Sequence, residues 1–128
     1  MKDRLIALKL VKALEPYDPW FYEEIVQALN VDVMAEIARK THIPIATGER
    51  IFTKWGFREI LEKRAATILQ PDVCYAGGIT ELRLIAGQAE AHWQERNSGN
   101  ASSPAAGGRP FPRHPDVLLL TVLDSLRA

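Results

Sequence analysis

The sequence has a single cysteine and no excess of charge of either sign. One cysteine, Cys74, cannot form a disulfide within the chain. Sixteen basic residues balance sixteen acidic ones, so the formal net charge is zero and the pI is near 6.8. Without a net charge, long-range attraction to nucleic acid or to an anionic membrane surface is weak. We therefore expect neither a nucleic-acid partner nor a membrane partner.

A long hydrophobic run is also missing. The longest apolar stretch, residues 117–123 with Thr121 inside it, is far shorter than the roughly 20 residues that a transmembrane helix needs. The first residues, Met1 to Arg4, lead into a short amphipathic run and not into the apolar region of a secretion signal. These absences predict a cytoplasmic protein. Its 128 residues and 47% hydrophobic content suit one domain with a packed core.

The composition changes near residue 96. Residues 97–112 contain three Gly, three Ser, three Pro and two Asn, which is typical of a linker. Such a stretch buries too little apolar surface to offset the entropy of ordering it. We therefore predict a folded domain over residues 1–95, and a low-complexity linker with an unrelated, disordered tail over 96–128.

Within the first 95 residues the hydrophobic period alternates between that of a helix and that of a strand. The predicted helices cover about residues 5–14, 33–38, 53–64 and 82–92, and the predicted strands cover 20–22, 43–47 and 67–70. Thr53 is the predicted N-cap of the third helix, and Gly77–Gly78 predicts a turn before the fourth. The alternation indicates an α/β fold with parallel strands joined by right-handed helical crossovers.

An acidic residue follows each predicted strand. Glu23, Glu49 and Asp72 are separated by 26 and 23 residues, so each strand would deliver one carboxylate to the carboxyl edge of the sheet, where ligands bind in parallel α/β folds. Carboxylate oxygens are suitable ligands for Mg²⁺. The alternative is that each acid is solvated or caps the next helix, as Asp72 would cap the turn before Gly77–Gly78.

Four segments carry a more specific signal: LEPY at residues 14–17, FYEE at 21–24, THIPIATGER at 41–50 and LQPDVCYAGGITE at 69–81. In this order and spacing they resemble the sugar-acid dehydratases of the mandelate racemase branch of the enolase superfamily. The resemblance runs from about residue 5 to residue 92.

The resemblance implies a (β/α)₈ TIM barrel, of which this chain would form about three βα modules, each a strand with its following helix. It implies a carbon–oxygen lyase that uses Mg²⁺, removes a proton next to the carboxylate of a galactonate-like sugar acid, and then expels water. By the same resemblance Glu23 and Glu49 are metal ligands, and Asp72 is a catalytic acid that orients a histidine.

Two neighbouring residues have open interpretations. Arg50 is predicted to bind the anionic substrate, although a surface salt bridge is the more frequent use of such an arginine. Glu24 either contacts the metal ligands without binding the metal itself or is simply a solvated neighbour.

The sequence also departs from the family pattern. Ile25 stands where the family has proline, and the first metal ligand and the proton-transferring bases have no counterpart here. His42 and His92 are better interpreted as structural residues, and His114 follows the linker in no recognisable strand. We therefore expect an inactive fragment of such an enzyme.

Two other functions compete with that of a dehydratase fragment. A non-catalytic assembly module could pair its open sheet edges with a second copy, as a homo-oligomer, or with a complementary half-barrel. A nucleotide-binding domain is disfavoured because no glycine-rich loop follows the first predicted strand.

Overall fold

The computed structural model describes residues 2–98, and the side-chain surroundings of residues 3–92. The elements in order are α1 (Lys2–Leu14), a 3₁₀ turn η1 (Glu15–Tyr17), β1 (Tyr22–Glu23), α2 (Val31–Ala38), β2 (Ile45–Thr47), α3 (Thr53–Glu62), β3 (Ile68–Leu69), α4 (Val73–Ala76) and α5 (Ile79–Ser98). The predicted tail lies almost entirely outside the described residues. Within residues 2–98, no helix is both long and apolar enough to cross a membrane.

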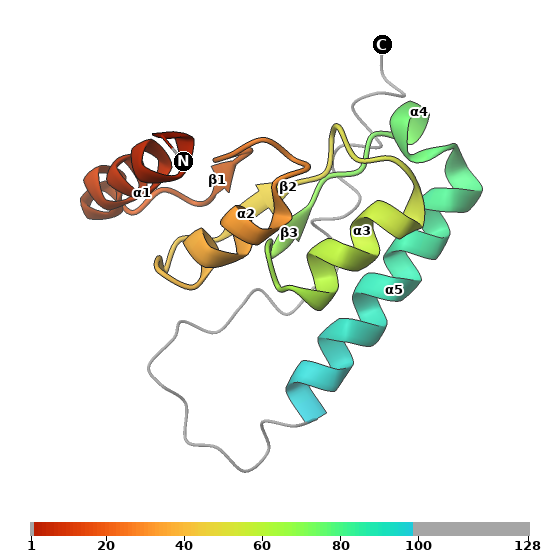
Figure 1. The fold of residues 1–128 in the computed structure, drawn as a ribbon. Coiled ribbons are helices and arrows are strands. Elements are labelled where there is room, and N and C mark those ends of the chain that lie inside the picture. Colours follow the sequence, from red (N-terminus) through yellow and green to blue (C-terminus); the bar gives the residue numbers. More distant parts are fainter. Residues whose placement is uncertain (1, 99–128) are drawn as a thin grey trace.

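The three strands form one parallel sheet in the order β1-β2-β3, as the alternating pattern predicted. Tyr22 pairs with Ile45, and Thr47 pairs with Leu69. Helices connect the strands, and α5 runs alongside α3 (Figure 1). The parallel order places the ends of all three strands at the same edge of the sheet.

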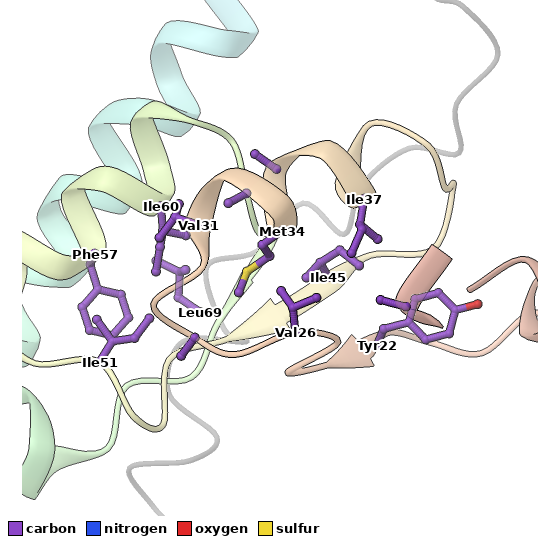
Figure 2. Packing of buried hydrophobic residues seen from close by; sticks show 14 of the residues in the cluster. Tyr22, Val26, Val31, Met34, Ile37, Ile45, Ile51, Phe57, Ile60 and Leu69 are labelled. Atoms are coloured by element: carbon purple, nitrogen blue, oxygen red, sulfur yellow. The ribbon is translucent and has the colours of Figure 1, made fainter. Parts of the chain in front are cut away.

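Alternation along the strands gives the sheet two different faces. Tyr22, Ile45 and Leu69 belong to the hydrophobic core, whereas Ala46 is buried but does not join that cluster. Glu23 and Ala46, which pair with each other, each come one residue after Tyr22 and Ile45. They therefore lie on the opposite face of the sheet, away from the helices. Figure 2 shows the core between strands and helices; the helical members labelled there are Val31, Met34, Ile37, Phe57 and Ile60.

The strands are shorter than predicted. Trp20 and Phe21 lie before β1, and the Trp20 side chain is 89% exposed. Within the described residues β1 pairs with β2 alone. The β propensity of Trp20 and Phe21 is not enough to extend the strand, because it depends on packing against neighbouring strands. At the start of β2, Pro44 has no N–H to donate, and the strand begins at Ile45.

Three details of the helices also differ from prediction. The N-cap of α3 is Phe52 and not Thr53, which is the first helical residue and has a positive φ of 54°. The short helix α4 was not predicted. Helix α5 continues to Ser98, so the start of the predicted linker is helical, because extending an existing helix costs little. The glycine turn is confirmed, since Gly77 and Gly78 have φ of 108° and 97°.

Candidate functional site

The three predicted acids lie where the strands end. Glu23 is the last residue of β1, Glu49 follows the end of β2, and Asp72 follows the end of β3. Because the strands are parallel, all three belong to the carboxyl edge of the sheet. Among residues 3–92, however, no three His, Cys, Asp or Glu side chains are grouped closely enough to hold a metal ion. The roles assigned to these acids therefore stay predictions.

Glu23 and Glu24 differ in their surroundings. Glu23 is exposed, on the face of the sheet away from the helices. Glu24 is half-buried with a positive φ of 48°, and its N–H donates to the Ala46 carbonyl at 3.0 Å. Its carboxylate Oε1 accepts a hydrogen bond from Thr47 Oγ1 at 2.7 Å. Glu24 therefore connects the end of β1 to the end of β2. The neighbouring Ile25 is partly buried against the core.

Glu49 and Arg50 form the tip of a turn. The Ile51 N–H donates to the Gly48 carbonyl at 3.1 Å, and both tip residues are exposed. Gly48 has a φ of 146°, and a Cβ at this position would lie 2.7 Å from the backbone of Gln70. The absence of a side chain at Gly48 thus lets the Glu49 turn pack directly against the end of β3.

Asp72 is the N-cap of α4. Its Oδ1 accepts hydrogen bonds from the N–H groups of Cys74 and Tyr75, both at 2.8 Å. The capping role, which is the alternative to catalysis for this residue, is therefore present. Both bonds use one oxygen, so Oδ2 is not part of the cap. A second role that uses Oδ2 is compatible with this geometry.

Sequence reasoning assigned no role to Glu81 and Lys54, which join two helices. The Lys54 N–H donates to Glu81 Oε1 at 2.8 Å, and Lys54 Nζ lies 3.3 Å from the same oxygen. The hydrogen bond from the Lys54 backbone is the main cause that lowers the pKa of Glu81, with the Lys54 side chain acting in the same direction. The sequence does predict an acid, Glu81, in the first turn of the helix after Gly78. It does not predict that Lys54 is the partner of this acid.

The two histidines within the described residues, His42 and His92, do not lie beside the three acids. His42 precedes β2, at the opposite edge of the sheet, with Nδ1 3.8 Å from Glu15 Oε1 and Nε2 3.8 Å from Asp18 Oδ1. His92 lies inside α5, with Nδ1 3.0 Å from the Gln88 carbonyl, and not at the helix end as predicted, because α5 continues to Ser98. His114 lies outside the described residues. A cavity of about 210 Å³ adjoins His42, between the ends of α2 and α3 and the starts of β2 and β3.

Comparison with known proteins supports one family. Residues 3–105 match the family described as enolase C-terminal domain-like. D-galactonate dehydratase from Ralstonia nicotianae is 51% identical over 87 residues, which cover 68% of this chain and 23% of that protein. The resemblance predicted from the four sequence segments is thereby confirmed.

Solved structures of similar proteins support the same family. L-talarate dehydratase from a Polaromonas species, complexed with Mg and L-glucarate, is 32% identical with a TM-score of 0.68, over 70% of this chain and 24% of that one. A mandelate racemase/muconate lactonizing enzyme-like protein from a Roseovarius species is 49% identical with a TM-score of 0.65, over 67% and 22% of the two chains. The chain thus spans about a quarter of the length of these relatives.

Proposed function

This chain belongs to the enolase C-terminal domain-like family, and we propose that it contributes part of the active site of a Mg²⁺-dependent sugar-acid dehydratase. The observation that carries the proposal is the parallel pairing of β1, β2 and β3, each of which has one acid at or just after its end, at the same edge of the sheet. The similarity to D-galactonate dehydratase makes galactonate the substrate to test first.

In this proposal Glu23 and Glu49 hold the metal ion. Carboxylate oxygens are the donors that Mg²⁺ prefers, so the donor chemistry fits. A bound Mg²⁺ would stabilise the enediolate that forms when the proton next to the substrate carboxylate is removed. No group of three suitable side chains occurs among residues 3–92, so the proposal includes a further ligand supplied by another part of the enzyme. Glu24 would act as a positioning residue, because it fixes Thr47 close to Glu49.

Asp72 and Arg50 have separate roles. Asp72 would accept an N–H from a histidine through Oδ2, which favours the imidazolium form and makes that ring an acid for the departing hydroxyl group. The proton from the imidazolium and the hydroxyl leave together as water. Arg50, exposed beside Glu49, would pair with the substrate carboxylate.

A chimera tests this proposal. The matching 87-residue stretch of the Ralstonia enzyme is replaced by that of this chain, and galactonate turnover is measured with Mg²⁺. We expect turnover, and we expect Glu49→Gln to lower kcat/KM by about a hundredfold or more, because a metal ligand is lost. Glu62→Gln, at an exposed acid of α3 paired with Arg58, should leave the rate unchanged. A folded chimera without activity, or full activity in the Glu49 variant, would contradict the proposal.

The chain by itself should not turn over galactonate, because two carboxylates without a base cannot transfer the proton. A measurable rate that Glu49→Gln abolishes would overturn this expectation.

A second candidate function is supported by the open sheet. Within residues 2–98, β1 and β3 each pair with β2 only, so both outer edges carry unpaired backbone groups. A module that assembles through these edges, with a second copy of the chain or with a complementary half-barrel, would use them directly.

A further inference from the structure

We propose that Glu81 is a positioning residue that holds the Glu49 turn in place through the first turn of α3. The inference rests on the proposed function, in which Glu49 is a metal ligand that needs a fixed place at the carboxyl edge of the sheet. Its evidence is a set of contacts between the segment 48–54 and the segment 70–81, which both follow their strands at this edge.

The first step concerns the start of α3. The four N–H groups at a helix start have no partner within the helix, and a side chain at the N-cap usually accepts one of them. The N-cap here is Phe52, which makes no such bond. The carboxylate of Glu81 takes its place from a distance of 27 residues in the sequence, by accepting the Lys54 N–H at 2.8 Å.

The second step concerns Thr53, which lies between the Glu49 turn and this hydrogen bond. Its φ of 54° is in the left-handed region, which is unfavourable for a β-branched residue. Such a conformation persists only where its surroundings hold it. The Glu81 contact fixes the next N–H in the chain, so it is placed to hold Thr53 in this conformation.

The third step concerns the remaining contacts of the turn. Gly48 packs on the Gln70 backbone, and the rings of Phe52 and Tyr75 have centroids 5.4 Å apart. The starts of α3 and α5 lie at the same end of the molecule, beside α4 (Figure 1). The Glu49 turn is thus anchored at its beginning and at its end to the segment that also carries Asp72.

The charge of Glu81 agrees with this role. Its side chain is 17% exposed, and Lys54 Nζ lies 3.3 Å from Oε1 and 3.5 Å from Oε2. The pKa of Glu81 is lowered mainly by the Lys54 backbone N–H, so the carboxylate is ionised at neutral pH. An ionised acceptor makes a stronger hydrogen bond to an amide than a neutral one.

The experiment uses the complete 128-residue chain and amide hydrogen exchange measured by NMR. In Glu81→Ala we expect exchange at residues 49–54 to rise by ~10-fold or more, while β2 and α2 stay unchanged, because only a local contact is lost. Glu62→Gln on α3 is the matched control, and it should leave the exchange of residues 49–54 as it was. Unchanged exchange in Glu81→Ala, or a uniform rise along the chain, would overturn the inference.

A double variant separates positioning from simple helix packing. Thr53→Gly removes the cost of the left-handed conformation, so Thr53→Gly with Glu81→Ala should recover part of the lost protection at residues 49–52. The Lys54 N–H has lost its acceptor in both variants and should stay exchangeable. If Glu81 only packed α5 against α3, the glycine would restore nothing, and the inference would fail.

Glu81→Gln covers the case in which the alanine variant does not fold, because the amide oxygen can still accept the bond. In the unsubstituted chain the chemical shift of the Lys54 amide proton should change with pH, with a midpoint below the ordinary pKa of a glutamate. This change should vanish in Glu81→Gln. An amide that does not titrate would overturn the inference. None of these measurements needs a metal, so a failed chimera would refute the proposed function without deciding this result.

Discussion

Gly48 is the residue whose backbone most directly determines where Glu49 lies. Its φ of 146° is open to glycine but rarely adopted by other residues, and the nearest atoms to an added Cβ are backbone atoms of Gln70 at 2.7–2.8 Å. A backbone neighbour cannot rotate away as a long side chain can. The close contact between the ends of β2 and β3 therefore depends on the missing side chain.

We predict that Gly48→Ala lowers the free energy of unfolding by about 2–4 kcal/mol, through backbone strain and the clash with Gln70. The matched control is Gly87→Ala, in α5, where an added Cβ meets nothing within 4 Å. There the methyl group should stabilise the helix by about 0.5–1 kcal/mol. Urea unfolding followed by circular dichroism measures both changes. Equal midpoints for the two variants would show that Gly48 is not a close-packed position.

The site residues were predictable from the sequence to different degrees. Glu23, Glu49 and Asp72 could be assigned to one edge because the alternating pattern predicts parallel strands. Their roles come only from the resemblance of the segments and stay predictions. The bond between Glu81 and Lys54 could not, because a contact across 27 residues depends on how α3 and α5 pack. Thr53 was predicted as the N-cap because local chemistry favours threonine there, and this was wrong because Glu81 accepts the Lys54 N–H.

At the scale of elements, α1 is tied to α2 by an ion-pair cluster around Glu36. Arg4 Nε donates to Glu36 Oε2 at 2.6 Å, and Lys40 Nζ donates to Oε1 at 2.6 Å. These two bonds, that of Arg4 first, lower the pKa of Glu36 to about 2. Ala7 and Val11 of α1 are buried nearby in the core, so the cluster holds a helix that also packs through apolar contacts.

The sign of the pH effect follows from this lowered pKa. The ionised form of Glu36 is favoured in the folded state, so its contribution to stability is present above the ordinary pKa of 4.5 and is lost as the pH falls towards 2. We expect Glu36→Gln to have a urea midpoint that falls less between pH 5 and about 2 than that of the unsubstituted chain. Glu90→Gln, at an exposed acid of α5, is the control and should keep the original slope. Equal slopes in all three proteins would contradict the assignment.

The lengths of the elements were less predictable than their order. Thr67 and Gln70 were expected inside the third strand, and their N–H groups do bond to Ile45 and Thr47 carbonyls at 2.9 Å, but β3 itself covers only Ile68–Leu69. Apolar period and β propensity predict which residues are extended. They do not predict where pairing stops, because that depends on the neighbouring strand.

At the scale of the whole molecule, the sheet has two open edges within the described residues. In β1 the N–H groups of Tyr22 and Glu24 point to β2, since they donate to the carbonyls of Pro44 and Ala46. By alternation the N–H of Glu23 points to the open side. Trp20, 89% exposed, lies just before this edge. An unprotected edge beside an exposed aromatic ring favours pairing with another copy of the chain.

We therefore predict concentration-dependent self-association at ~10–100 μM in sedimentation experiments, where exposed edges begin to meet. Trp20→Lys should shift the average mass towards the 14.3 kDa monomer, because a charge beside the edge opposes strand pairing. Leu29→Lys is the matched control, since Leu29 is 86% exposed but lies in the turn between β1 and α2. If both lysines act equally, general hydrophobicity and not the β1 edge causes association. If the unsubstituted chain stays monomeric throughout this range, the assembly function loses its support and the chain's open edges do not pair with each other.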